Sequence, residues 1–240
     1  MTTIGLVRDR AQATMRPARS GSRVRQVLLA CGVLSSLLYL ATDVLGGLRD
    51  PAYSFWSQTI SELGAIGAPS QQFVAPLFMA YPVLAFAFAV GILWESGRRN
   101  RALRLTGALL AVYTVVGVVG FSSSPVHQRG TGSLASDLPH IIVAGLVVFF
   151  WLLTIGVGAF ALGKRFRIYS LATLVTVLVF FVLTALYVPR VAANEPTPGL
   201  GLIERIDVYA AMLWLAVLAT ALLRTHRHDG PTAKAAGGEL

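Results

Sequence analysis

Six apolar stretches, each long enough to cross a lipid bilayer, constrain this chain of 240 residues more than any other feature. A helix needs about 20 mainly apolar residues to span the hydrocarbon core of a membrane. The stretches occupy residues 27–47, 74–94, 103–121, 139–162, 168–188 and 206–223. The sequence therefore predicts an all-α integral membrane bundle of six transmembrane helices.

The composition excludes most other classes of protein. Hydrophobic residues make up 55% of the chain and charged residues only 13%, whereas soluble domains carry about 25% charged residues. A single cysteine, Cys31, cannot supply a disulfide framework. The formal net charge of +9 could suggest nucleic acid. Because the arginines lie in short blocks between apolar stretches and not along one face, nucleic-acid binding is not expected.

The distribution of Lys and Arg predicts the orientation of the bundle. Sixteen of these residues lie in the two tails and in the second and fourth connections, and four lie in the other connections. The side richer in Lys and Arg faces the cytoplasm in membrane proteins. We therefore expect a plasma-membrane protein with both termini in the cytoplasm and three longer loops outside.

Two polar segments flank the membrane domain of residues 27–223. Residues 1–26 are polar and basic, and residues 224–240 end in Ala, Gly and Thr without periodicity. Both segments are predicted to be disordered cytoplasmic tails.

The first outer loop, residues 50–69, is the most informative connection. Its segment Thr59-Ile-Ser-Glu62 fits a capping box, in which the Glu62 carboxylate reaches back to the Thr59 amide. Phe55, Trp56, Ile60 and Leu63 suit a short amphipathic helix in the headgroup region. Alternatively, Ser61 and Glu62 face the bundle and contact a ligand.

Three ionisable residues lie at similar depth in three of the predicted helices. Asp43 is near the outer end of the first helix, His140 begins the fourth, and Asp207 begins the sixth. Ionisable groups at this depth are costly, so they face the bundle and find partners. They form either structural ion pairs, with Arg190 or Arg205 as the cation, or a polar cavity that opens outward.

Metal and enzyme chemistry have few candidate residues. Asp137 and His140 could contribute to a metal site only with further ligands such as His127, Glu62 or Asp207. Ser61, His140 and Asp207 are formally a serine–histidine–acid set, but no nucleophile elbow accompanies them. No cofactor motif is present, and no inverted repeat of the kind found in transporters is visible.

Three sequence patches resemble the bacterial multi-pass membrane family known as domain of unknown function 998. They are Pro51-Ala-Tyr-Ser54 through Thr59-Ile-Ser-Glu-Leu-Gly64 and Gly67-Ala-Pro69; Gly120-Phe-Ser-Ser-Ser-Pro125 followed by His140; and Gly199-Leu-Gly-Leu-Ile-Glu-Arg205 with Trp214. The resemblance implies a six-helix fold and no established reaction. The family often has Phe-Pro with a cysteine or aspartate in the second patch, where this chain has Phe121-Ser-Ser-Ser-Pro125.

Together these features predict a polar, outward-facing site that binds or handles a lipid or a small amphiphile. The candidate ligand-binding residues are Asp43, Tyr53, Ser61, Glu62, His140, Arg205 and Asp207. Membrane lipid is the expected partner, and the oligomeric state stays open. One alternative is an intramembrane hydrolase that uses His140 with acidic residues. It would resemble the ceramidase-like membrane hydrolases, but their late H-x-x-x-H pattern is missing from the last span. A second alternative is a small-solute transporter with His140 as a proton relay.

Overall fold

Six helices of the computed structural model are long and apolar enough to cross a membrane, which confirms the predicted all-α fold. The structure describes residues 3–97 and 100–228, with side chains for residue 21, 23–97 and 100–225. The long helices are α1 (Thr3–Arg49), α2 (Gln71–Ser96), α3 (Arg101–Ser123), α4 (Leu134–Gly158), α5 (Lys164–Ala185) and α7 (Leu200–His228). Two short helices, η1 (Ser61–Gly64) and α6 (Val188–Ala192), lie in the connections.

Every long helix begins earlier than hydropathy predicts, and the difference is five residues for α4 and six for α7. The Ser133 side chain forms a capping box with Ser136, so α4 begins at Leu134 and Pro139 lies inside the helix instead of in its first turn. α7 begins at Leu200, so Arg205 belongs to the helix and does not precede it. The predicted fourth span also ends four residues too late, because α4 ends at Gly158.

The two predicted tails differ in how much of them the structure describes. α1 begins at Thr3, so its helical backbone runs through most of the segment expected to be a disordered tail. Its membrane-spanning part is Arg23–Arg49. In the C-terminal segment α7 continues to His228, and residues 229–240 lie outside the described residues.

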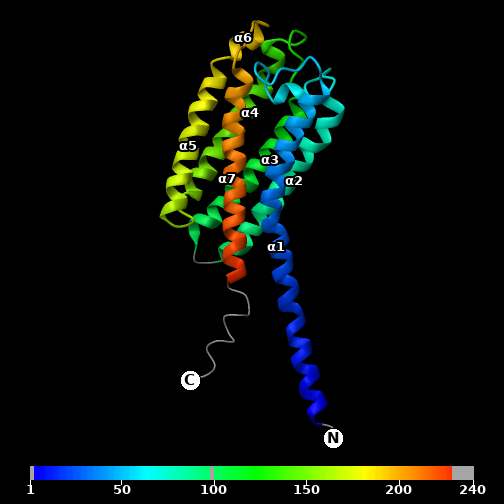
Figure 1. Cartoon of the computed structure of the whole chain (residues 1–240), viewed down its shortest axis with the longest axis vertical. Helices are drawn as coiled ribbons and strands as arrows, with labels where there is room; N and C mark the ends of the chain where they lie inside the picture. Colours follow the sequence, from blue (N-terminus) through cyan, green and yellow to red (C-terminus); the bar gives the residue numbers. More distant parts are fainter. Residues whose placement is uncertain (1–2, 98–99, 229–240) are drawn as a thin grey trace.

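The six long helices form a closed ring. Each packs against two others in the order α1, α2, α3, α4, α5, α7 and back to α1. Figure 1 shows both chain termini at one end of this ring, with α6 and the longer connections at the other. We call these the terminal end and the loop end.

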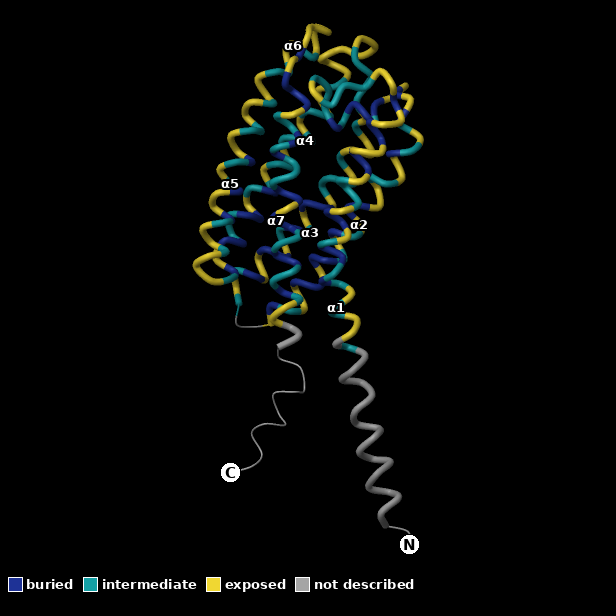
Figure 2. The backbone as a smooth tube through the Cα atoms, in the orientation of Figure 1, coloured by how far each residue is buried: buried dark blue, intermediate teal, exposed yellow. Residues whose placement is uncertain are grey.

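A continuous apolar core fills the half of the ring nearer the terminal end. It includes Leu29 of α1, Phe88 of α2, Leu110 of α3, Ile155 of α4 and Leu218 of α7. Nearer the loop end, residues 115–123, 134–150 and 178–192 have no buried side chain. Figure 2 shows this along α5, whose turns near the loop end are teal and yellow.

An aromatic layer crosses the middle of the ring. Its members are Tyr39, Tyr81, Tyr113, Trp151 and Trp214, from α1, α2, α3, α4 and α7. The ring centroids of Tyr39 and Tyr81 are 4.9 Å apart, and the hydroxyls of Tyr81 and Tyr113 are 2.8 Å apart. The Trp214 indole donates to the Ser170 hydroxyl of α5 at 2.8 Å, so every long helix contributes to this layer. Four of its members, Tyr81, Tyr113, Trp151 and Trp214, belong to the apolar core itself, and Tyr39 packs against it.

Candidate functional site

The first loop, residues 50–70, is a folded cover on the loop end and not the predicted amphipathic helix. Only Ser61–Gly64 is helical, as one 3-10 turn, and turns make up most of the rest. Ile60 and Leu63 are buried against Val74 of α2, whereas Trp56 is 57% exposed. The prediction was wrong because the loop's backbone hydrogen bonds are divided between short-range turns, such as the Tyr53 amide to the Asp50 carbonyl, and residues of other elements, such as Glu204 of α7.

Arg205 of α7 and Asp43 of α1 form a buried, bidentate ion pair. Arg205 Nε lies 2.9 Å from Asp43 Oδ2, and Nη2 lies 2.7 Å from Oδ1. The Tyr209 hydroxyl also donates to Asp43 Oδ2 at 2.5 Å. Asp43 is fully buried and Arg205 is 7% exposed. Paired in this way, both charges can remain inside the bundle.

The same guanidinium holds the first loop onto α7. Arg205 Nη1 donates to the carbonyl oxygens of Phe55 and Gln58, each at 3.1 Å. Arg205 Nη2 donates to the Tyr53 hydroxyl at 2.6 Å, and that hydroxyl donates to the Thr59 carbonyl at 2.8 Å. Burial raises the pKa of Tyr53 above its ordinary value, although Arg205 opposes the shift. The phenol therefore keeps the proton that it donates to Thr59.

Glu62 forms a second bidentate pair, with Arg129 of the connection between α3 and α4. Arg129 Nε and Nη2 lie 2.8 and 2.9 Å from the two Glu62 carboxylate oxygens. Arg129 Nη1 donates to the Thr197 hydroxyl, which in turn donates to the Ser57 carbonyl, both at 2.7 Å. Glu62 Oε2 also accepts from the Thr59 amide at 2.7 Å, as the capping-box pattern predicts. This pair joins the first loop to the other two loops.

Main-chain contacts complete the attachment of the first loop. The Gly201 amide at the start of α7 donates to the Trp56 carbonyl at 3.0 Å. The Ile66 amide donates to the Val126 carbonyl at 2.8 Å, and the Gln128 amide donates to the Ile66 carbonyl at 3.2 Å. The loop is thus fixed at both of its ends.

Ser61 and His140 lie apart from these two ion pairs. The Ser61 hydroxyl is 3.1 Å from the Thr59 hydroxyl. His140 Nδ1 lies 2.9 Å from the Ser124 carbonyl, and its ring is 5.0 Å from that of Phe121. Within the described part of the chain, no hydrogen bond joins His140 to Ser61 or to an acidic residue. The structure therefore does not assemble Ser61, His140 and Asp207 into a catalytic set.

Two of the metal candidates, Asp137 and His127, lie together, but no third ligand joins them among the described residues. Asp137 Oδ1 lies 2.7 Å from His127 Nδ1 and accepts from the His127 amide at 3.2 Å. Asp137 lies in the first turn of α4, as the helix dipole favours. The described residues contain no group of three His, Cys, Asp or Glu that could hold a metal ion.

Asp207 is the one sequence-predicted site residue that is buried without a partner in the described part of the chain. It is 5% exposed, and no described residue forms a hydrogen bond or ion pair with it. Glu204 lies one turn earlier on α7, and its Oε2 accepts from the Ile60 amide at 2.5 Å. Glu204 and Asp207 therefore lie one turn apart on α7, with Glu204 against the first loop.

Four residues of this region are absent from the sequence-predicted site: Arg129, Thr197, Glu204 and Tyr209. Arg129 could have been selected from the sequence, because it is one of only four Lys and Arg residues on the predicted outer side. Glu204 directly precedes Arg205, and hydropathy places both outside the helix. No pattern in the sequence distinguishes Thr197 or Tyr209.

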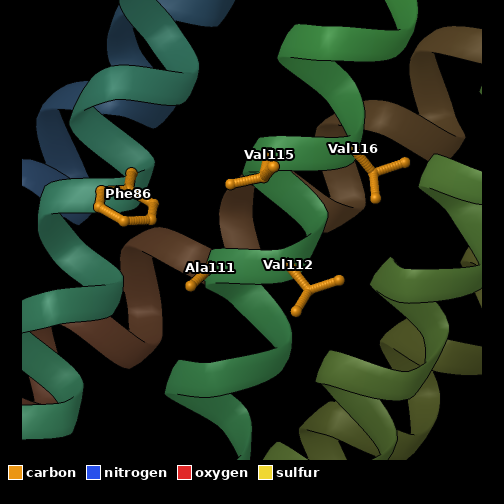
Figure 3. Close-up of a pocket in the computed structure, with 5 residues that line it drawn as sticks. All are labelled: Phe86, Ala111, Val112, Val115 and Val116. Carbon is orange, nitrogen blue, oxygen red and sulfur yellow. The ribbon is translucent and has the colours of Figure 1, made fainter.

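A shallow apolar depression of about 250 Å³ lies between α2 and α3, away from these polar residues. Figure 3 shows Phe86 of α2 beside Ala111 and Val115 of α3, with Val112 and Val116 completing its wall. Its lining has no polar side chain, so it suits a hydrocarbon chain and no polar ligand.

The sequence comparison identifies a family and no individual relative. A family model described as "Protein of unknown function (DUF998)" matches residues 33–221, which include four of the six membrane-spanning segments in full and most of the first and the last. No curated protein and no solved structure matches the chain. The matched range contains both ion pairs, the first loop, Glu204 and Asp207. The chain is therefore a multi-pass membrane protein that belongs to the DUF998 family.

Proposed function

We propose that this protein binds a lipid or another small amphiphile at the loop end, with the ligand's head group at Asp207 and Glu204. The observation that carries the proposal is the unpartnered carboxyl group of Asp207, only 5% exposed. A buried ionisable group without a partner is costly in a membrane, and such groups mark ligand, ion or proton sites. Three other acids of the loop end, Asp43, Glu62 and Asp137, have basic partners.

The position of Asp207 suits a head group held beneath the first loop. Trp214 of the aromatic layer lies seven residues further along α7, or about 10 Å at the usual rise of an α-helix. Ile60 of the first loop contacts Glu204 on the opposite side. The head group would thus lie between the first loop and the aromatic layer.

The loop-end halves of three helices support access from the membrane. Residues 115–123, 134–150 and 178–192 include many large apolar side chains, and none of these residues is buried. A hydrocarbon chain could lie against this surface while its head group reaches the acids of α7.

The alternative functions have less support. A hydrolase that uses His140 needs an acid or a nucleophile beside the imidazole, and His140 contacts the Ser124 carbonyl instead. A transporter needs a path through the bundle, and the aromatic layer fills the middle of the ring with rings from five helices.

We further propose that the protein lies in the plasma membrane with the loop end outside. The Lys and Arg residues support this orientation, because sixteen of twenty lie in the two tails and in the second and fourth connections of the sequence. The amphiphile would then come from the outer leaflet.

The experiment that tests the proposed function is lipid analysis of the purified protein and of cells that lack it. We expect one lipid or amphiphile class to co-purify with the wild-type chain and to be depleted from Asp207→Asn. The matched control is Glu195→Gln, which removes an exposed negative charge at the same end. If both variants retain the same lipids as the wild type, and the lipids of deletion cells are unchanged, the proposal is wrong.

A further inference from the structure

The seam between α4 and α5 is closed near the terminal end and open toward the loop end. A Cβ atom added at Gly156 of α4 would lie 3.2 Å from the Leu174 side chain of α5. Gly145 lies about three turns earlier on α4, so it belongs to the same face of the helix as Gly156. A Cβ atom added at Gly145 would meet no side chain and no other helix within 4 Å. The two helices therefore touch near Gly156 and stand apart near Gly145.

The opposite side of α4 is closed at the level of Gly145. A Cβ atom added at Gly120 of α3 would lie 2.5 Å from the Val143 side chain of α4. On α5, by contrast, the last buried residue is Val177, and the helix continues to Ala185. The opening therefore lies on one side of α4, between its loop-end half and that of α5.

The face of α7 that carries Asp207 is turned toward this seam. Trp214 of α7 contacts both walls of the seam. Its indole donates to the Ser170 hydroxyl of α5 at 2.8 Å, and its ring lies 2.6 Å from the position of a Cβ atom added at Gly158 of α4. Asp207 lies about two turns before Trp214, on the same face of α7 and nearer the loop end. The unpartnered carboxyl group of Asp207 is thus on the inner side of the seam, toward its open half.

A second polar group without a partner belongs to the open half. Thr184 of α5 lies about three turns after Thr173, on the same face of the helix. The Thr173 hydroxyl donates to the Tyr169 carbonyl at 3.0 Å, whereas the buried hydroxyl oxygen of Thr184 forms no hydrogen bond with any described residue. A buried hydroxyl without a partner lowers stability, and the ester or amide oxygen of a lipid can accept its proton.

The opening is continuous with the lipid-facing surface of the bundle. Its two walls belong to the membrane-spanning segments Leu134–Gly158 and Lys164–Ala192. Residues 141–162 and 168–189 contain no charged side chain. Next to the opening, Leu146 and Phe149 of α4 and Val182 of α5 are exposed. Hydrocarbon chains are the surroundings of such a surface at membrane depth.

We infer that the hydrocarbon chain of a membrane lipid enters the bundle sideways between α4 and α5, with the polar end of that lipid at Thr184 and Asp207. The inference rests on the proposed function, because it names the route and the position of the chain for the same ligand. The first loop can then stay attached while the ligand exchanges with the bilayer.

The test uses the two tryptophans of the aromatic layer, Trp151 and Trp214, as reporters. The chain has four tryptophans, and the other two, Trp56 and Trp94, are exposed. Trp56→Phe with Trp94→Phe therefore leaves only the reporters. This full-length chain is reconstituted into phosphatidylcholine vesicles whose hydrocarbon chains do or do not carry bromine, which quenches tryptophan at short range. We expect a loss of fluorescence in the brominated vesicles.

Gly145→Phe fills the opening, so it should restore most of the lost fluorescence. The matched control is Gly163→Phe, in the turn between α4 and α5 at the terminal end. A Cβ atom added at Gly163 also meets no atom within 4 Å, but this variant should leave the quenching unchanged. Gly145→Leu is a second, smaller variant of the opening, and size-exclusion chromatography verifies that each variant remains folded.

The outcomes separate the entry route from the proposed function. Equal fluorescence in the two kinds of vesicle would mean that something other than lipid covers the opening, such as a second copy of the chain, and the inference would be wrong. Equal quenching with and without Gly145→Phe would mean that bromine acts from outside the bundle, which also overturns the inference. If Asp207→Asn loses its co-purifying lipid in that case, only the entry route is wrong and the proposed function stands. If Asp207→Asn keeps its lipid while Gly145→Phe restores fluorescence, the route is correct and the head-group position is wrong.

Discussion

Arg205 meets six oxygen atoms at the loop end, from α1, the first loop and α7 itself. A guanidinium group offers five N–H donors in a fixed planar arrangement, so it can bridge a carboxylate and several carbonyls at once. Lysine cannot reproduce this geometry. Arg205 therefore acts as a structural residue that connects two helices and the first loop.

Removal of the negative partner should destabilise the bundle strongly. Asp43→Asn leaves Arg205 buried without its counter-charge, and breaking one side of a buried pair costs about 3–5 kcal/mol. We expect a marked decrease in Tm of the purified variant, measured by thermal unfolding in detergent. An unchanged Tm would mean that the pair contributes nothing to stability.

The same substitution at Asp207 should have the opposite effect. Asp207→Asn removes a buried carboxyl group that has no partner in the described part of the chain, so the ligand-free protein should gain about 1 kcal/mol or more. We expect the Tm to rise without ligand, in the same assay as for Asp43→Asn. A fall in Tm for both variants would contradict the distinction between the paired and the unpartnered acid.

The residue scale also shows where prediction from sequence stops. Asp43, Arg205 and Asp207 were all selected because charged groups are costly at membrane depth. Hydropathy alone does not predict whether Asp43 or Asp207 pairs with Arg205. The choice depends on how α1 and α7 are rotated about their axes. The choice of Asp43 over Asp207 is visible only once both helices are packed.

At the scale of elements, the first loop depends on Glu62 and Arg129 for its attachment to the other two loops. In Glu62→Gln the neutral amide can accept only a weaker hydrogen bond from the guanidinium. We expect amide hydrogen exchange in residues 57–64 to become about tenfold faster, which corresponds to a loss of about 1.4 kcal/mol in local stability. Exchange should be unaffected in Glu195→Gln, and equal rates in the wild type and Glu62→Gln would show that the ion pair does not hold the loop.

Helix packing near the aromatic layer requires a glycine on α4. A Cβ atom at Gly158 would lie 2.6 Å from the Trp214 ring, which is fully buried. Gly158→Ala should therefore destabilise the protein by about 1–3 kcal/mol. Gly145→Ala on the same helix is the control, because no side chain or other helix lies within 4 Å of its added Cβ. If both variants unfold at the same temperature as the wild type, the ring of Trp214 is free to move.

The elements themselves were largely predictable, whereas the loops were not. Six long apolar stretches are enough to predict six membrane helices, almost regardless of which apolar residues they contain. The first loop was predicted as an amphipathic helix because Phe55, Trp56, Ile60 and Leu63 have suitable spacing. Its conformation is instead determined by distant partners, among them Arg129 and Gly201, that local spacing cannot identify.

For the whole molecule, the charge asymmetry predicts a single orientation in the membrane. The test uses single cysteines in a Cys31→Ala background, since Cys31 is buried and is the only cysteine. We expect a membrane-impermeant maleimide to label Glu195→Cys at the loop end in intact cells. Gly163→Cys, in an exposed turn at the terminal end, should react only after the membrane is permeabilised. The reverse pattern would place the loop end in the cytoplasm.

The ion pair between Asp43 and Arg205 also has a consequence for biosynthesis. The two residues are 162 positions apart in the sequence and belong to the first and last membrane helices. Asp43 therefore enters the membrane well before Arg205 has been translated, and until then the first loop also lacks its attachment to α7. A nascent chain that stops before α7 would leave Asp43 unpaired in lipid. Completion of the last helix is thus the step at which the bundle closes, and a truncated chain should be a substrate for membrane quality-control proteases.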